Sequence, residues 1–136
     1  MPVLKFIFKY GKAIPIAGQN EDPEVLAKAY RSIQEEIAEE NVLGIFPEGK
    51  ITTDGEIQAF KTGIEKIVEK QPVPVVPMAL CNLWGSLFSR RDPLLKRRPY
   101  KFRARIELRI GEPIAPAELT AERLEQEIRK LRGPDR

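Results

Sequence analysis

Two charged side chains that could do chemistry stand close together in the run Phe46-Pro47-Glu48-Gly49-Lys50, directly after a short apolar stretch. A carboxylate can accept a hydrogen bond from a hydroxyl group, and an ammonium group can hold an anion such as a phosphate. These residue types suit a polar substrate head that carries both groups, whereas an exposed turn with ordinary charges is the alternative interpretation. Residue types alone favour the exposed turn; if the run binds a substrate, the candidate binding residues are Pro47, Glu48, Gly49, Lys50 and Thr52.

A nucleotide-binding phosphate loop is a further interpretation of this run, which differs from that motif by one residue. Such a loop needs a hydroxyl for magnesium where this chain has Ile51, and it needs backbone N–H groups where Pro47 has none. Glu48 would also add a negative charge beside the phosphates. We therefore do not expect the run to bind a nucleotide.

The chain contains no histidine, although histidine is the most frequent general base for a hydroxyl group. Cys81, Ser86 and Ser89 therefore have no histidine to activate them, and we expect Cys81 to be an inert core thiol. The cysteine and the carboxylates also lack the spacing of metal ligands. The sequence predicts no metal site and no bound cofactor.

The elements that would position the charged run alternate between strands and helices. Residues 42–46 and residues 73–80 are short apolar runs between breakers, as in central strands. Residues 102–110 alternate between apolar and charged side chains, as expected for a half-exposed strand. The pattern predicts an α/β fold with a mostly parallel central sheet covered by helices, in a single partial domain over residues 1–136. In such sheets, ligands bind beyond the carboxyl ends of the strands, where Glu48 would lie.

Three segments have the apolar periodicity and the end signals of helices. Asp22 and Pro23 suit the N-cap and the first position of a helix. Apolar residues at helical spacing between positions 60 and 68 mark a second helix. Thr120 is placed to begin a third helix, which Gly133 would end.

The basic residues are unevenly distributed. The net charge is +3, from 23 basic and 20 acidic residues, and basic residues crowd the stretch from 90 to 109. This stretch has three interpretations, which are a solvated face, a contact with anionic membrane lipids and a nucleic-acid surface. No RNA-binding signature is present, so we do not expect a nucleic-acid partner. The predicted membrane or anion surface consists of Trp84, Arg90, Arg91, Arg97 and Arg98.

Composition limits the class of protein. The chain has 136 residues, of which 42% are hydrophobic, enough for a packed core. No run approaches the roughly 20 consecutive apolar residues of a membrane span, and the first residues lack the pattern of a signal peptide. The single cysteine cannot form an internal disulfide. We therefore expect a cytoplasmic protein, and its oligomeric state stays open.

Four segments of the chain resemble the glycerolipid acyltransferase family, which includes the 1-acylglycerol-3-phosphate acyltransferases. Residues 46–49 and 73–77 resemble the third and fourth motif blocks of that family, in the right order. Residues 13–16 resemble the second block, and residues 83–89 resemble the segment after the fourth. The similarity covers roughly residues 2–115 and is closest to the acyltransferase portion of bacterial proteins that fuse a lysophospholipid transporter to an acyltransferase.

The resemblance implies transfer of a fatty acyl group from coenzyme A or acyl carrier protein to a lysophospholipid or glycerol-phosphate hydroxyl. The enzyme would work as a peripheral protein on the inner, cytoplasmic face of the membrane. The family's first block is a histidine and an aspartate separated by four residues, and the histidine acts as general base. This chain has no histidine, so that block is absent. We expect the block upstream of Met1, which would make the chain an N-terminally truncated domain that is inactive alone.

Two motif blocks also depart from the family's pattern. Ala17-Gly18 stand where the second block usually ends in an arginine, and Lys50-Ile51-Thr52 replace threonine-arginine-serine in the third. Two expected arginines are therefore missing, and a lysophospholipid acceptor fits better than glycerol 3-phosphate. A non-catalytic lipid- or anion-binding module on the same fold is the alternative function. The resemblance further implies a strand along the acyl pocket that contains Val73, Pro74, Val76 and Pro77.

Overall fold

The computed structural model describes residues 13–14, 16, 22–50, 52, 54–83 and 105–134. The chain divides into two compact units, residues 1–44 and residues 45–136. The prediction of a single partial domain stays a prediction.

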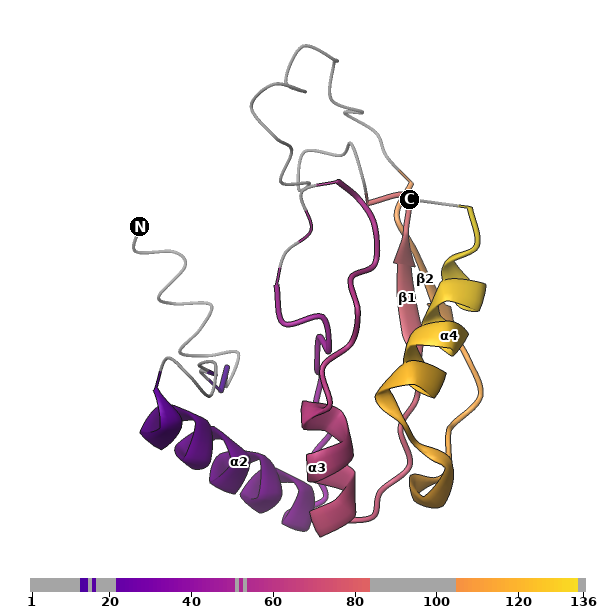
Figure 1. Ribbon diagram of the computed structural model, residues 1–136. Coiled ribbons are helices and arrows are strands. Elements are labelled where there is room, and N and C mark those ends of the chain that lie inside the picture. Colours follow the sequence, from indigo (N-terminus) through magenta and orange to yellow (C-terminus); the bar gives the residue numbers. More distant parts are fainter. Residues whose placement is uncertain are drawn as a thin grey trace. The chain divides into compact units, whose positions relative to one another are not determined.

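The first unit contains helix α2, Pro23–Ala38, coloured indigo in Figure 1. Asp22 is its N-cap, and one oxygen of its side chain accepts hydrogen bonds from two backbone N–H groups of the first turn, each at 3.1 Å. Ala29 and Ile33 lie one turn apart on the helix and are both buried. The predicted start of this helix at Asp22 and Pro23 is confirmed.

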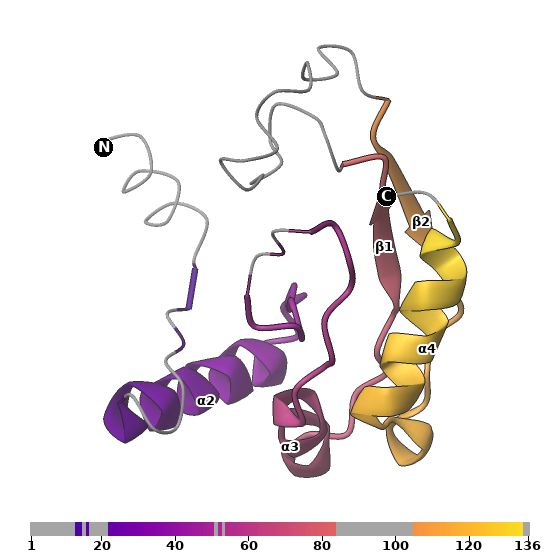
Figure 2. The ribbon, with the colours of Figure 1, turned by 45° about the horizontal axis from the view of Figure 1, so that its top comes forward.

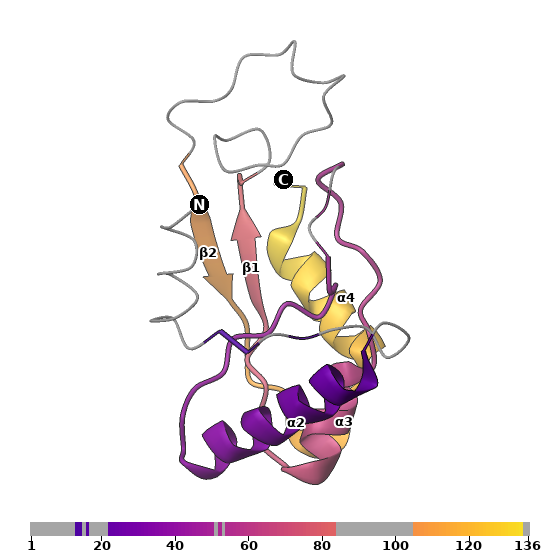
Figure 3. The ribbon, with the colours of Figure 1, turned by 90° about the vertical axis from the view of Figure 1, so that its left-hand side faces the viewer.

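The second unit contains a two-stranded antiparallel sheet. Strand β1, Met78–Cys81, pairs with strand β2, Glu107–Ile110, so that Met78 faces Ile110 and Leu80 faces Leu108. An isolated antiparallel bridge between Val75 and Ile114 continues the pairing beyond the strands. Helix α4, Ala121–Arg132, runs alongside the strand pair in all three ribbon views (Figures 1, 2 and 3).

The two faces of this sheet differ in burial. Ala79 and Cys81 of β1 point to the buried face, whereas Met78 and Leu80, which alternate with them along the strand, are exposed. Leu108 and Ile110 of β2 are 55% and 59% exposed. The alternation predicted for residues 102–110 is therefore present in the described strand, but the apolar side chains lie on the uncovered face.

The core of the second unit is formed by the two helices and by the segments that precede β1 and follow β2. Helix α3, Gly63–Lys70, buries the apolar stripe that the sequence predicted. A short 3₁₀ helix, η2, Pro116–Glu118, leads into α4. The buried core residues are Ile64, Val68, Ile114, Leu119, Ala121 and Leu124, with Phe60, Val75 and Ile128 packed against them.

The amino end of α4 is held by two side chains. Thr120 is the N-cap, and its hydroxyl oxygen accepts a hydrogen bond from the backbone N–H of Arg123 at 3.0 Å. The carboxylate of Glu65 in α3 accepts a second one from the N–H of Ala121 at 2.6 Å. A negative charge at a helix amino end is favourable because the N–H groups there carry partial positive charge. The predicted cap at Thr120 is confirmed, and Glu65 ties α3 to α4.

The carboxyl end of α4 is held by a cation from the sheet. Arg109 of β2 donates hydrogen bonds through Nη1 to the carbonyl oxygens of Leu131 and Arg132, both at 3.1 Å. Gly133 follows with a positive φ of 58°, which glycine adopts without the steric cost of a side chain. Arg109 therefore lies on the covered face of the sheet, opposite to the placement that its alternation with apolar residues predicted.

The predicted mostly parallel sheet is not seen among the described residues, where the sheet is antiparallel. The predicted central strand at residues 42–46 is also wrong for this structure, because Val42 is 98% and Phe46 is 78% exposed and no described strand pairs with them. An apolar run indicates a tendency to be buried, but a strand forms only where a neighbour completes its backbone hydrogen bonds. The apolar run at residues 42–46 does not by itself specify which strand it would pair with.

Candidate functional site

The Glu48 loop, residues 47–50, is closed by two hydrogen bonds to the segment that follows it. The Oε2 atom of Glu48 accepts a hydrogen bond from the backbone N–H of Gln58 at 2.8 Å. The carbonyl oxygen of Pro47 accepts another from the N–H of Lys61 at 2.9 Å. Because the carboxylate is bonded to backbone, its position is set by the path of the chain rather than by a mobile side-chain partner.

Gly49 forms the turn of this loop. Its N–H donates to the carbonyl oxygen of Phe46 at 3.1 Å, and its φ of +65° lies in the left-handed region that favours glycine. A Cβ atom at Gly49 would lie 2.9 Å from Nζ of Lys61. The ammonium group of Lys61 therefore lies against Gly49 in this turn.

Lys61 is a candidate site residue that the sequence analysis missed. The only signal in the sequence was a second lysine beside Phe60, just before the predicted helix. Its proximity to Gly49 depends on the return of the chain after residue 55, which no local pattern specifies. Lys50 itself is exposed, so the loop carries one exposed lysine of its own and is contacted at Gly49 by a second.

Thr52 takes part in a turn of its own. Its hydroxyl donates to Oδ1 of Asp54 at 2.6 Å and accepts from the N–H of Gly55 at 3.1 Å. The Thr52 hydroxyl, followed by the N–H of Glu56, lowers the pKa of Asp54 from its usual value because both stabilise the carboxylate. A substrate group at Thr52 would have to share or replace these contacts.

The four residues predicted along an acyl pocket lie just before β1. Pro77 is buried, and its carbonyl oxygen accepts a hydrogen bond from the N–H of Gly111 at 2.9 Å. Val73 is half-buried, whereas Pro74 and Val76 are exposed. The structure thus brings Pro77 into the packing with the segment after β2, and the acyl-pocket role of all four stays a prediction.

A model of the acyltransferase family matches residues 1–81, which is more than half of the 136-residue chain. The matched segment includes the Glu48 loop, α3 and β1. The chain belongs to the acyltransferase family. No curated protein and no solved structure matches the chain.

In this member of the acyltransferase family, β2 and α4 lie outside the matched segment, although they pack against it. The resemblance to an acyltransferase family is therefore confirmed for residues 1–81. The nearer likeness to transporter fusion proteins, the missing first block and the acceptor stay predictions.

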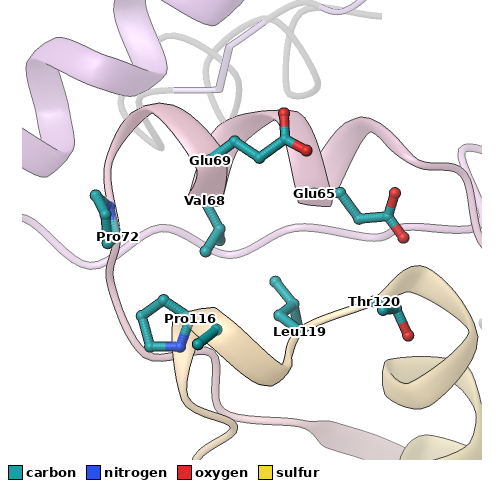
Figure 4. Close-up of a pocket in the computed structure, with 8 residues that line it drawn as sticks. Glu65, Val68, Glu69, Pro72, Pro116, Leu119 and Thr120 are labelled. Carbon is teal, nitrogen blue, oxygen red and sulfur yellow. The ribbon is translucent and has the colours of Figure 1, made fainter.

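A groove in the described part of the acyltransferase chain contains none of the predicted site residues. It measures about 500 Å³ and lies between α3 and the η2 segment. Figure 4 shows Val68 and Leu119 facing each other across it, with Glu65 and Glu69 along the α3 side. Glu65 already binds the amino end of α4. The groove is lined by Glu65, Val68, Glu69, Pro72, Pro116, Ala117, Leu119 and Thr120.

The predicted membrane or anion surface, from Trp84 to Arg98, lies outside the described residues, as do Ser86 and Ser89. Within the described ranges, no helix has both the length and the apolar character needed to cross a bilayer. The same part of the chain gathers no group of three or more potential metal ligands. The expectations about membrane, metal and cofactor stay predictions.

Cys81 is fully buried, with 0% of its surface exposed. Its Sγ atom lies 3.9 Å from the carbonyl oxygen of Arg132 at the end of α4. Buried structural cysteines are shielded from reagents and are inert. Its position at the covered face of the sheet fits the predicted role as an inert core residue.

Proposed function

We propose that this chain is part of a glycerophospholipid acyltransferase. The enzyme moves a fatty acyl group from acyl-CoA or acyl carrier protein to a hydroxyl of a lysophospholipid or a glycerol phosphate. The family match supports acyl transfer in general. The single observation that carries the assignment of the acceptor is the Glu48 loop, where Glu48 is bonded to Gln58, Lys61 lies against Gly49, and the exposed Lys50 follows in the chain.

The loop offers the two kinds of contact that such an acceptor needs. Lys50 and Lys61 supply ammonium groups, which bind a phosphate as point charges. Glu48 uses one oxygen to accept from Gln58, and a carboxylate has capacity for further donors, so it can also orient a hydroxyl. A lysophospholipid carries a phosphate and a hydroxyl a few bonds apart, and it is the acceptor of the transporter fusion proteins that the sequence resembles.

The chemical step needs a base that this sequence does not contain. A histidine would take the proton of the acceptor hydroxyl, whose oxygen then attacks the thioester carbonyl carbon of the donor. A C–O bond forms, the C–S bond breaks, and the thiol of coenzyme A or of the carrier protein leaves with the proton. The sequence has no histidine, so we propose that polypeptide outside it supplies this residue. Losing a positioned base lowers a rate by about 10²–10⁴-fold.

Binding and turnover test the proposal together. A short-chain lysophosphatidic acid should bind the 136-residue chain. Lys61→Ala should raise the dissociation constant by about tenfold, as loss of one charged hydrogen bond does. Lys66→Ala, which removes an exposed lysine of α3, is the matched control. The chain alone should show almost no acyl transfer. Normal turnover by the chain alone would contradict the assignment of the base.

A non-catalytic lipid- or anion-binding module is the second candidate, and the absence of histidine favours it. Joining an upstream segment that carries the histidine and aspartate of the family's first block separates the two functions. If the joined protein transfers acyl groups, the chain is part of an enzyme. If it binds lysophosphatidic acid but transfers nothing, the module assignment holds.

We also propose that the protein works at the cytoplasmic face of the membrane as a peripheral protein. The basic residues between positions 90 and 109 support this because each basic residue near an anionic surface adds about 1 kcal/mol of attraction. Vesicles containing phosphatidylserine should carry the protein upward in flotation. Replacing Arg97 and Arg98 by glutamine should reduce the floated fraction, and unchanged flotation would exclude this patch.

A further inference from the structure

Three side chains of α4 lie along one side of the helix and contact the segment that leads into α3. They are Glu125, Arg129 and Arg132, spaced by four and three residues, which places them on one helical face. We call them the α4 stripe. Figure 3 shows the magenta segment before α3 running beside α4. Hydrogen bonds from Phe60 to Glu125 and from Arg129 to Ile57 join the segment to the helix.

The first two members of the stripe hold the middle of this segment. Oε2 of Glu125 accepts a hydrogen bond from the backbone N–H of Phe60 at 3.0 Å. Arg129 donates through Nη2 to the carbonyl oxygen of Ile57 at 2.7 Å and through Nε to Oε1 of Glu125 at 2.9 Å. One carboxylate and one guanidinium therefore bind each other and the same stretch of backbone.

The third member holds the start of the segment. Arg132 donates through Nη1 to the carbonyl oxygen of Gly55 at 2.9 Å and through Nη2 to Oε2 of Glu56 at 3.1 Å. Its side chain is only 14% exposed, and its Nε is buried without a partner among the described residues. Burying a guanidinium is costly in solvation free energy, so Arg132 is better explained by the geometry that it imposes than by a net gain in stability.

The other side of the same segment holds the Glu48 loop. Gln58, which lies between residues that the stripe binds, donates its N–H to Glu48, and Lys61, which follows Phe60, donates its N–H to Pro47. An irregular segment has no ladder of its own, so its backbone groups need outside partners to keep one conformation. Here those partners are the α4 stripe on one side and the Glu48 loop on the other.

We propose that Glu125, Arg129 and Arg132 are positioning residues for the Glu48 loop. They hold residues 55–60 in the path that presents the N–H groups of Gln58 and Lys61 to the loop. The consequence for an acceptor rests on the proposed function, whereas the positioning itself does not. The stripe lies outside the segment matched by the family, residues 1–81, whereas the Glu48 loop lies inside it.

Amide hydrogen exchange, followed by NMR in the 136-residue chain, tests the positioning directly. In Arg129→Ala, the amides of Gln58 and Lys61 should exchange about tenfold faster, because a charge-assisted hydrogen bond of the segment is lost. Lys130→Ala is the matched control, because Lys130 pairs with Glu127 on α4 itself and is 69% exposed. Exchange at the buried residues of α3 reports global stability.

Each outcome of this experiment decides the matter. Faster exchange at Gln58 and Lys61 with unchanged exchange in α3 supports positioning. Unchanged exchange at Gln58 and Lys61 overturns it. Acceleration by the same factor in α3 also overturns it, because the stripe would then stabilise the whole unit rather than the loop.

A conservative pair of variants adds a readout that a merely structural role would not change. Glu125→Gln keeps an acceptor oxygen for the N–H of Phe60, whereas Glu125→Ala removes it. Protection of Phe60 should stay within about threefold of the wild type in the first variant and fall about tenfold in the second. The amide proton shift of Phe60 should follow the ionisation of Glu125 in the wild type and lose that pH dependence in both variants. Equal protection of Phe60 in the two variants would overturn the role of Glu125.

Lysophosphatidic acid binding separates this inference from the proposed function. If both hold, Arg129→Ala weakens binding about five- to tenfold while Lys130→Ala does not. If the wild type binds no lysophosphatidic acid, the proposed acceptor is wrong, and the exchange experiment still decides the positioning. If the wild type binds it and Arg129→Ala binds equally well with faster exchange at Gln58, the stripe positions a segment that the ligand does not use.

Discussion

Gln58 and Glu48 are ten residues apart in the chain and are joined by a hydrogen bond of 2.8 Å from the backbone N–H of Gln58 to Oε2 of Glu48. This bond fixes the charged run at residues 47–50 as a loop against the backbone at Gln58. It also links the candidate binding residues to the segment that α4 holds.

The Glu48 carboxylate should contribute to stability as well as to binding. Glu48→Ala leaves the N–H of Gln58 without its partner, and we expect it to lower the free energy of unfolding by about 1–2 kcal/mol. Glu48→Gln keeps an acceptor oxygen and should lose less than about 1 kcal/mol. Urea denaturation measures both, with Glu69→Ala on the exposed side of α3 as control. Equal stability of Glu48→Ala and the wild type would show that this bond contributes nothing.

Gly49 should not tolerate a side chain. Gly49→Ala combines a left-handed φ of +65° with a Cβ that approaches Nζ of Lys61 to 2.9 Å. We expect a loss of about 1–2 kcal/mol in the free energy of unfolding and weaker binding of phosphate ligands, because Lys61 has to move. Gly44→Ala is the control, since its Cβ would meet nothing within 4 Å. The two variants should differ clearly in the same thermal or urea titration.

Acid should weaken the contact between α4 and the segment before α3. The hydrogen bond from the N–H of Phe60, followed by that from Arg129, lowers the pKa of Glu125 below its usual 4.5. A carboxyl whose pKa is lower in the folded state stabilises the fold above pH 4.5 and loses that contribution as the pH falls through the lowered value. Urea titrations between pH 7 and pH 3 should show this decline, and Glu125→Gln should reduce it. An identical pH profile in the variant would contradict the assignment.

Cys81 should be unreactive in the folded protein. It is the single cysteine and has 0% exposure, so a thiol reagent such as dithionitrobenzoate should label it only after denaturation. Cys81→Ser places a hydroxyl in this packed site and should cost about 1–3 kcal/mol of stability. Cys81→Ala, which adds no polar group, should cost less. Rapid labelling in the native state would show that the covered face of the sheet opens readily.

The uncovered face of the sheet should promote self-association of the isolated chain. Met78, Leu80, Leu108 and Ile110 are all exposed on that face and pair across the two strands. Exposed apolar patches of this kind mark interaction or aggregation sites. Sedimentation velocity should show concentration-dependent association that Leu108→Lys reduces. Ala117→Lys adds the same charge at an exposed position of η2 and should leave association unchanged.

Membership of an acyltransferase family was readable from the sequence because it rests on short blocks in a fixed order. The charged run at residues 46–50 and the proline-bracketed run at residues 73–77 both fall within the matched segment. The helix ends at Asp22, Thr120 and Gly133 were readable for a similar reason. A cap depends on the hydrogen-bonding groups of its own side chain and of the next three residues, so local sequence determines it.

Tertiary structure alone decided which distant groups meet. Lys61 reaches Gly49, Arg109 turns toward the end of α4, and Arg129 binds the backbone at Ile57 because the chain folds back on itself. Alternation along a strand says which side chains share a face, but not which face a helix will cover. The apolar run at residues 42–46 likewise carries no information about a strand partner. Such pairings depend on the free energy of the whole packed unit, so the local sequence around each residue does not predict them.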